Sequence, residues 1–479
     1  MSLLYKFFLG ILIAKIIFVL AFVGIFGEAR LIWSDSAAYL NIGRNLWSGY
    51  GFVSSGGDPL IYTPNTIRTP IYPAIIGFFD RFVPHGLAVV SFLQAALAAF
   101  AAVLIYKLAL RFLDHRWALG VTLVASFEPL ISVIHILIMP EILLLVFILL
   151  FLDSFLRYLD DRRISDLLLV SLWLGIATMI KPAALYLFVV PLFFLIKDYI
   201  FSYVRSEKRS NKLLRLFVFL GVMVLLLFPW AARNYVTAGV IGVTTDDAAN
   251  ICGWTLSGIL ATKHRLDASN FDVLYAHPEY QEQVKRCTST GAALKLFAAE
   301  YPVDFAKTMF LSSIAMLTND GYAAFFEKAP AEEKRPDQWE APVKIHHNYL
   351  TPAVFTNRDW PARFLAAAQE LRPHERVAVI VGKLFWLLIL FFALLSAWQL
   401  VIKQHSLPAF FLFLVIVYFV AAAVITNAYG VGARLRFSVN PLLLLFAGIG
   451  AHNLFNNIFR SPLHFLKNTP NILGYDGKR

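Results

Sequence analysis

Long apolar runs recur along the chain and are separated by short polar segments. Each run is near the roughly 20 residues that an α-helix needs to cross the hydrocarbon core of a bilayer. The runs cover residues 7–27, 87–112, 117–134, 137–156, 166–182, 183–200, 212–231, 378–402, 407–426 and 434–456. This pattern predicts an all-α polytopic membrane protein, a bundle of about 10–11 transmembrane helices.

Lysine and arginine are concentrated in alternate connections between the runs. These connections are residues 106–116, 157–165, 201–215 and 403–406 and the tail after residue 460. With ten helices they all lie on one side together with both termini, and the positive-inside rule makes that side cytoplasmic. We therefore expect a multi-pass protein of the inner (plasma) membrane. A further apolar stretch at 305–317 would make eleven spans and move the basic tail outside, so we expect it to lie on the surface.

The chain divides into three regions. Residues 1–231 form an N-terminal transmembrane module, 232–377 a large outer loop region with interfacial helices, and 378–479 the C-terminal transmembrane helices and a cytoplasmic tail. Both cysteines, Cys252 and Cys287, lie in the large outer loop. In an oxidising compartment a disulfide is plausible, and two free thiols are equally compatible with the sequence.

The first outer segment, residues 28–86, belongs to the N-terminal module. Residues 36–47 carry apolar side chains at helical spacing, which is typical of a helix that lies in the membrane interface. Residues 70–82 are apolar but too short to span, so we expect a re-entrant or interfacial element there.

Composition narrows the possible functions. The 479 residues are 59% hydrophobic and 15% charged, whereas a soluble domain is roughly a quarter charged. The net charge of +11 lies mostly in short loops, where it suits contact with membrane lipids. No basic stripe with interleaved aromatic residues indicates a nucleic-acid partner. The sequence also has no Walker, Rossmann, HExxH or GxSxG motif, so we expect a substrate already activated by a lipid phosphate.

Charged residues beside the spans, other than the basic residues of the inner loops, fall on the outer face. They are Asp35, Arg68, Glu141, Lys181, Arg233, Arg434 and Arg436. Ionisable groups at membrane depth are costly, so such a set is a functional-site hypothesis. Two carboxylates that face several fixed cations suit an enzyme that binds a lipid phosphate and deprotonates an acceptor.

Each of these residues also has a structural explanation. Ser34 or Asp35 would cap the amphipathic helix that follows them. Glu141 would be favoured by the dipole of the helix that it begins. A single outer arginine could bind lipid headgroups, an explanation that fits Arg434 better than Arg233 or Arg436.

Several motifs in this order resemble the bacterial membrane glycosyltransferases of the GT-C fold, in the group related to protein O-mannosyltransferases and the lipid A aminoarabinose transferase. The resemblance covers the chain to about residue 260 and the final helix. The motifs are SDSAAYLNIGRNLWSGYGF, RTPIYPAIIGFF, MPEILLLVFILL, LGIATMIKPAAL, FPWAARNYVTAGVIG and RLRFSVNPLLLLFAGIG.

The resemblance implies the inverting transfer of one sugar from a polyprenyl-phosphate donor to an acceptor lipid, glycan or protein on the outer, periplasmic face. By position, Asp35 would be the catalytic carboxylate of the first loop, Glu141 the second acidic residue, and Arg233 and Arg436 the donor-phosphate ligands. Asp35 would then act as general base while cations stabilise the leaving phosphate. The alternative is a lipid-linked sugar flippase or transporter that binds but does not react. Inverted repeats would be expected there, and the sequence has no clear pair.

Departures from the family pattern bear on metal dependence. A single acidic residue stands at Asp35 instead of an acidic pair, and Lys181 replaces the more usual arginine before proline. These departures favour a site with no metal and no cofactor, with a divalent metal as the less favoured alternative. His346 and His347 are adjacent, and adjacent histidines rarely bind one ion without further ligands, so we expect them to be loop residues.

Overall fold

A computed structural model describes residues 3–33, 35–55, 61–200, 209–266, 271–321, 369, 372–428 and 432–467. His346 and His347 lie outside the described residues. The N-terminal half contains α1 (Leu3–Phe26), η1 (Glu28–Leu31), α2 (Ser36–Trp47), β1 (Val53–Ser55), β2 (Tyr62–Pro64), α3 (Ile71–Phe82), α4 (Gly86–Ala109), α5 (His115–Phe127), α6 (Pro129–Ile134), α7 (Glu141–Asp161), α8 (Ile164–Ile180), η2 (Pro182–Phe188), α9 (Val189–Ile200) and α10 (Arg209–Ala238). The C-terminal half contains α11 (Asp246–Asn250), η4 (Ile251–Thr255), α12 (Leu256–His264), α13 (Phe271–Ala276), α14 (Pro278–Arg286), α15 (Thr290–Glu300), α16 (Pro302–Thr318), α20 (Pro373–Ala397), η5 (Trp398–Lys403), α21 (Leu407–Asn427), α22 (Ala433–Arg436), η6 (Phe437–Val439) and α23 (Asn440–Lys467).

The all-α polytopic membrane fold predicted from the apolar runs is confirmed. In the described part of the chain, eight helices are long and apolar enough to cross a membrane. They are Tyr5–Phe26, Gly86–Ala109, Glu141–Asp161, Pro182–Ile200, Asn211–Ala238, Pro373–Lys403, Leu407–Asn427 and Ala433–Asn456. Helix α8, with 17 residues, is a shorter apolar helix. The run at 117–134 divides into α5 and α6, because Pro129 follows the end of α5 and begins the next helix. The stretch at 305–317 forms α16, which is not among the eight.

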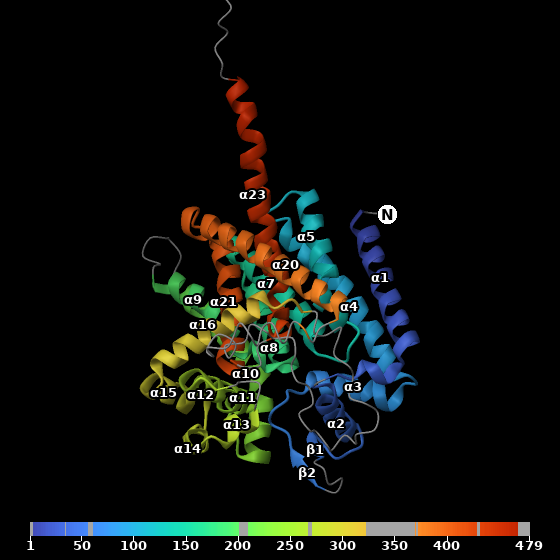
Figure 1. Cartoon of the computed structure of the whole chain (residues 1–479), viewed down its shortest axis with the longest axis vertical. Coiled ribbons are helices and arrows are strands. Elements are labelled where there is room, and N and C mark those ends of the chain that lie inside the picture. The colour runs from blue at the N-terminus through green and yellow to red at the C-terminus, as the bar shows by residue number, and fades with distance from the viewer. Residues whose placement is uncertain are drawn as a thin grey trace, which may run out of the picture.

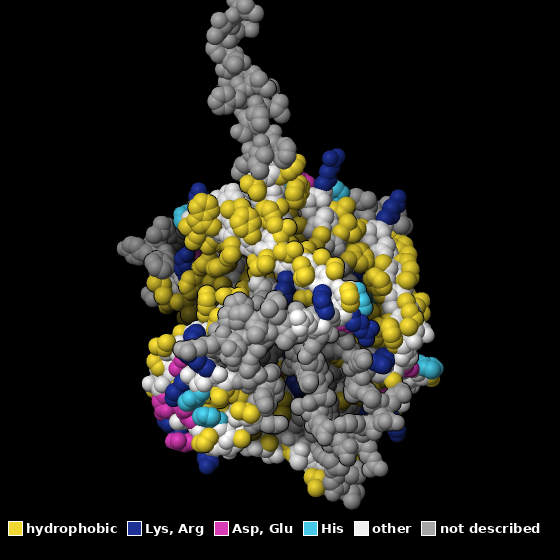
Figure 2. Space-filling view, viewed as in Figure 1, with side chains coloured by type: hydrophobic (Ala, Val, Ile, Leu, Met, Phe, Trp, Pro, Cys, Tyr) yellow, Lys and Arg dark blue, Asp and Glu magenta, His cyan; other side chains and the backbone are white. Residues whose placement is uncertain are grey.

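Helix α7 lies at the centre of the bundle, against α4 and α8 (Figure 1). Its buried face continues into an aromatic core, where the ring centroids of Phe155 and Phe411 of α21 are 4.5 Å apart. By contrast, α20 exposes large apolar side chains, including Leu384, Leu388 and Phe391. The space-filling view shows hydrophobic side chains covering the face over α20 and α21 (Figure 2). Such an outward apolar face suits contact with lipid chains.

The first outer segment contains two helices that cross closely. Helix α2 spans Ser36–Trp47, as its amphipathic pattern predicts, and the stretch at 70–82 forms α3. At the crossing, a Cβ on Gly43 would lie 2.4 Å from the carbonyl oxygen of Pro73, and a Cβ on Gly77 would lie 2.4 Å from Gly43. Only glycine therefore permits this approach. Trp47 Nε1 donates to the carbonyl of Ala74 (2.8 Å) and fixes the pair.

In the described part of the large outer loop region, called here the second outer segment (residues 232–377), α11 to α16 form a helical unit. Its core contains Leu256, Tyr280 and Phe297, and the disulfide Cys252–Cys287 joins η4 to the end of α14. The cysteines are therefore bridged. Figure 1 shows α11 to α15 at the same end of the molecule as α2, β1 and β2, opposite the projecting end of α23.

The two outer segments are held together by the residues that precede α3 and those that precede α11. The backbone N–H of Thr245 donates to the carbonyl of Thr66 (2.9 Å), and Thr244 Oγ1 donates to the carbonyl of Ile67 (2.8 Å). The hairpin β1–β2 is antiparallel, with Val53 opposite Pro64. These contacts bring the start of α11 next to Arg68.

Candidate active site

Asp35 lies just before α2, and two arginines hold its carboxylate. Arg434 Nη2 donates to Oδ2 (2.6 Å) and Arg68 Nη2 to Oδ1 (3.2 Å). Asp35 makes no side-chain capping bond to α2, so the capping explanation does not hold for Asp35, and Ser34 lies outside the described residues. Burial opposes ionisation, but Arg434, Arg68 and Lys181 outweigh it and hold the pKa of the Asp35 carboxyl well below its usual range. Asp35 is therefore an anion at neutral pH.

Glu141 begins α7 and faces the interior of the bundle. Its Oε1 accepts hydrogen bonds from Arg434 Nε (2.7 Å) and Lys181 Nζ (2.9 Å). Its Oε2 is buried and has no hydrogen-bond partner among the described residues. The Glu141 side chain is 1% exposed, whereas that of Asp35 is 33% exposed. Asp35 is thus the carboxylate that an incoming molecule can reach.

Arg434 joins the two carboxylates through different nitrogen atoms. It lies in α22, a short helix that precedes α23, and its guanidinium is 5.7 Å from the centre of the Trp33 ring. The planar fork of donors allows one arginine to hold two carboxylates, which a lysine ammonium does with less directional control. Arg434 is therefore a structural link across the site.

The structure brings together five of the seven charged residues that the sequence singled out. These are Asp35, Arg68, Glu141, Lys181 and Arg434. They lie just before α2, in the segment before α3, at the start of α7, just after α8 and in α22.

Arg233 lies apart from the two carboxylates. Its guanidinium donates to the carbonyls of Phe52 (2.6 Å) and Asn65 (2.7 Å) and lies over the rings of Phe52 and Trp230. Arg233 therefore fixes the segments around the β1–β2 hairpin to α10.

Arg436 is also outside the carboxylate cluster. It is fully buried and donates to the carbonyls of Met316 (2.9 Å), Leu317 and Asn319 (2.9 Å), at the end of α16. Its guanidinium carbon is 3.5 Å from the centre of the Trp386 ring. Arg436 thus satisfies the last carbonyl groups of α16, which a helix end leaves without partners. A contact of Arg233 or Arg436 with a donor phosphate stays a prediction.

Two further residues belong to this site and were not singled out from the sequence. Asp246, the first residue of α11, lies 3.9 Å from Arg68 Nη1. The ring of Tyr39 lies under Arg68, 4.9 Å from its guanidinium carbon, and the Tyr39 hydroxyl is buried without a hydrogen-bond partner among the described residues. The pair Asp246–Asp247 was a visible signal in the large outer loop, but its proximity to Arg68 depends on the contacts between the two outer segments.

The charges of this cluster balance. Asp35, Glu141 and Asp246 face Arg68, Lys181 and Arg434. Arg434 lies between Asp35 and Glu141 and pairs with both carboxylates. The arrangement can present anionic and cationic groups to a polar molecule at the end of an apolar bundle.

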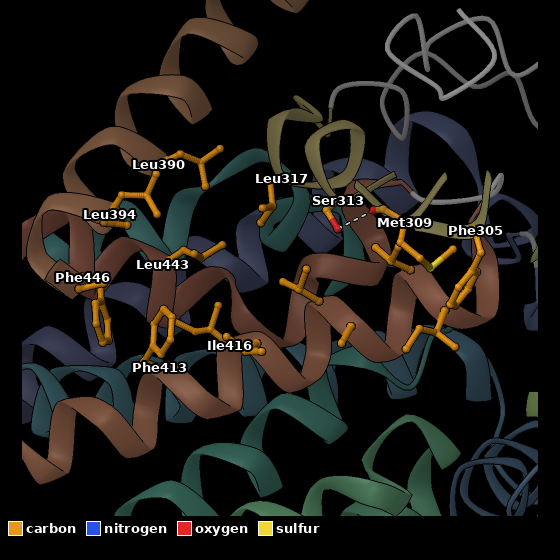
Figure 3. A pocket seen from close by; sticks show the side chains of 17 residues that line it. Phe305, Met309, Ser313, Leu317, Leu390, Leu394, Phe413, Ile416, Leu443 and Phe446 are labelled. Carbon is orange, nitrogen blue, oxygen red and sulfur yellow. Dashed lines mark hydrogen bonds between the residues drawn. The ribbon is translucent and has the colours of Figure 1, made fainter. Parts of the chain in front are cut away.

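An apolar cavity of about 440 Å³ lies between α16, α20, α21 and α23. Figure 3 shows its lining from four helices, with Leu317 of α16, Leu390 of α20, Phe413 of α21 and Leu443 of α23 among the side chains. Leu317 is also one of the residues whose carbonyl binds Arg436. The cavity has the dimensions and chemistry to hold a segment of an aliphatic chain.

A profile of the protein family described as Dolichyl-phosphate-mannose-protein mannosyltransferase matches residues 67–232. That stretch contains Arg68, Glu141 and Lys181 of the charged cluster. The resemblance that the sequence motifs indicated is therefore confirmed for this part of the chain. No curated protein sequence matches the chain significantly.

Solved structures give three informative comparisons. The chain is similar to the oligosaccharyltransferase of Archaeoglobus fulgidus in the apo form, with a TM-score of 0.47 and 15% identity over 98% of this chain and 53% of that chain. The same archaeal oligosaccharyltransferase, AglB, in complex with an inhibitory peptide and a dolichol-phosphate gives a TM-score of 0.46 and 15% identity over 99% and 53% of the two chains. ArnT from Cupriavidus metallidurans bound to undecaprenyl phosphate gives a TM-score of 0.37 and 12% identity over 97% and 80%. The chain spans about half the length of the oligosaccharyltransferase that it matches.

Proposed function

We propose that this protein is a membrane glycosyltransferase that moves a sugar from a polyprenyl-phosphate-linked donor to an acceptor, with inversion at the anomeric carbon. The observation that carries the proposal is the position of Asp35. Its carboxylate is ionised, one-third exposed and flanked by Arg68 and Arg434. A base for the acceptor and cations for the departing phosphate then lie within one site.

The two carboxylates have different tasks in this proposal. Asp35 orients the acceptor and receives its proton, because it is the accessible one. Glu141 is buried and holds Lys181 and Arg434 in position through its Oε1. Glu141 therefore contributes by fixing the two cations, and its loss would displace them.

Donor binding would activate Asp35. In the free protein, Arg68 and Arg434 stabilise the Asp35 carboxylate, which makes it a weak base. A donor phosphate that bonds to the same guanidinium groups competes for their hydrogen bonds and reduces that stabilisation. The pKa of Asp35 then rises towards its ordinary value when the donor is present. The base would be strongest in the donor complex, where the reaction needs it.

The donor lipid would occupy the apolar cavity between α16, α20, α21 and α23. Its lining is almost entirely aliphatic and aromatic, so it suits an isoprenoid segment. Arg436, which bonds to the Leu317 backbone at the cavity wall, supports the end of α16 there. The cavity and the cations would together account for a ligand with an apolar chain and an anionic head.

The reaction would take place on the outer, periplasmic face. The distribution of basic loops supports this orientation, since the charged cluster lies with the two outer segments and away from those loops. The acceptor, a lipid, glycan or protein, would be selected by the second outer segment, which borders the cluster through Asp246. In this proposal the cations that stabilise the departing phosphate are Arg68, Lys181 and Arg434, and a metal or further cofactor is not invoked.

The proposal is tested with the full-length protein in lipid nanodiscs, a radiolabelled polyprenyl-phosphate sugar and a crude acceptor fraction. The expected result is time-dependent transfer of label to an acceptor and release of polyprenyl phosphate, with the opposite anomeric configuration in the product. Donor binding without release of polyprenyl phosphate in the presence of any acceptor fraction would contradict the proposal and favour a flippase.

A further inference from the structure

Three potential metal ligands converge in the second outer segment, away from the charged cluster. His264 ends α12, His277 precedes the first turn of α14, and Glu279 lies in that turn. One ligand atom from each residue can be chosen so that all three lie within 4.8 Å of one another. Figure 2 shows histidine and acidic side chains gathered on the surface over α12 to α14.

The scaffold beneath these side chains fixes their spacing. The disulfide Cys252–Cys287 joins the element before α12 to the end of α14. Tyr280 of α14 packs with Leu260 of α12 in the same buried core. Since both supporting helices are held by a covalent bond and a packed core, little ordering is needed for the three side chains to act together.

The polar contacts of the three residues leave one imidazole nitrogen, on His277, available to a cation. His264 Nε2 lies 2.6 Å from Glu279 Oε2, while Glu279 Oε1 accepts from Lys263 Nζ (2.7 Å) and Tyr301 Oη (2.6 Å). His277 Nδ1 is buried and has no hydrogen-bond partner among the described residues. The rings of His264 and His277 are 4.6 Å apart. A metal ion would replace the proton between His264 and Oε2 and would bind the nitrogen of His277.

We propose that His264, His277 and Glu279 bind a divalent transition metal of the Zn²⁺ type. Two imidazole nitrogens and one carboxylate oxygen are a ligand set that zinc accepts, with a fourth position open to water or another ligand. In a tetrahedral site such ligand atoms lie about 3.3 Å apart, so side-chain rotation of the three residues closes the site. The ion would tie the end of α12 to the start of α14.

Charge sets the strength of this site. One oxygen of Glu279 already bonds to Lys263 Nζ (2.7 Å) and Tyr301 Oη (2.6 Å), which leaves Oε2 as the oxygen for a metal. The ammonium of Lys263 repels a second cation, so Lys263→Met should tighten metal binding several-fold. An ion-pair cluster without a metal function has no reason to respond in this way.

The test is zinc binding by the tag-free full-length protein after treatment with a chelator. Equilibrium dialysis with Zn²⁺ alone should give one tightly bound ion per chain, with binding weakened at least tenfold in His264→Gln and in His277→Gln. His85→Gln removes a histidine that pairs with Glu28 elsewhere on the outer surface and should leave binding unchanged. The double variant His346→Gln/His347→Gln should also retain the ion.

A second readout guards against variants that fail to fold. Co²⁺ in place of Zn²⁺ should produce visible absorption bands of a four-coordinate site, and these bands should be absent from either histidine variant that keeps the thermal unfolding temperature of the metal-free wild type. The proposal is overturned if the wild type binds no zinc, or if zinc binding is lost in the His346/His347 double variant and kept in His264→Gln.

Discussion

Arg434 Nη2 lies 2.6 Å from the carboxylate of Asp35, a residue 399 positions away in the sequence. The same guanidinium contacts Glu141 through Nε at 2.7 Å. The start of the last long helix is thereby connected to the beginning of α2 and of α7. These contacts connect the N-terminal and C-terminal parts of the chain at the point where the charged cluster lies.

Replacement of Arg434 tests this connection. Arg434→Gln leaves Glu141 buried with only Lys181 as a cationic partner, so we expect the free energy of unfolding to fall by about 3 kcal/mol. Arg44→Gln breaks the more exposed ion pair with Asp80 and should cost about 1 kcal/mol or less. Thermal unfolding in detergent compares the two variants. Equal losses would show that Arg434 contributes no more than a surface ion pair.

Arg436 should be needed for its shape as well as its charge. Arg436→Lys keeps the positive charge but loses several hydrogen bonds to the end of α16 and the stacking on Trp386. We expect a loss of about 2–3 kcal/mol in the free energy of unfolding. Thermal unfolding measures this loss, and an unchanged unfolding temperature would mean that the charge alone matters.

The hydroxyl groups of two neighbouring tyrosines should differ in their contribution to stability. Tyr72 Oη donates to Gln94 Oε1 (3.0 Å), so Tyr72→Phe should cost about 1 kcal/mol. The Tyr39 hydroxyl is buried without a partner among the described residues, so Tyr39→Phe should be neutral or stabilising. Thermal unfolding of both variants decides the matter. A greater loss in Tyr39→Phe would contradict this account of its hydroxyl.

Five of the seven charged residues meet as the sequence predicts, because helix ends on one face of a bundle are close in space. The placement of Asp35 and Glu141 depended only on the order and sidedness of the spans. The prediction for the helix at 36–47 also held, since its pattern has a single apolar face. These features follow from local pattern and topology.

The sequence could not reveal which arginines already use their hydrogen-bond donors within the fold. Arg233 and Arg436 bond to carbonyl groups of segments distant in sequence, and these partners depend on the packed structure. Asp246 reaches Arg68 only through contacts between residues 65–67 and 244–245. The pairing of Cys252 with Cys287 was likewise open until the outer unit was folded.

Asp247 should make stability depend on pH. Burial, with the neighbouring charge of Asp246, raises the pKa of Asp247 to about 6, above the value of about 3.9 in an unfolded chain. Between these values the folded protein holds the proton that the unfolded chain releases. Its contribution to stability is present below about pH 4 and is lost as the pH rises through 6. The free energy of unfolding of Asp247→Asn, measured relative to the wild type, should therefore increase by about 1–3 kcal/mol as the pH rises from 4 to 7.

Unfolding temperatures at pH 4 and pH 7 measure this difference between wild type and Asp247→Asn. The variant should gain relative stability at the higher pH. A constant difference across the range would show that Asp247 titrates normally in the folded protein.

The most direct measurement of the central claim is single-turnover transfer by Asp35→Asn with donor already bound, beside Asp80→Asn. Asp80 lies in α3 of the same outer segment and pairs with Arg44 outside the site, so it controls for the substitution itself. We predict that Asp35→Asn binds the labelled donor and loses transfer by at least a thousandfold, whereas Asp80→Asn retains both, since general base catalysis and the orientation of the acceptor are lost together. Transfer by Asp35→Asn at a rate within about tenfold of the wild type would contradict the role of Asp35 as the base.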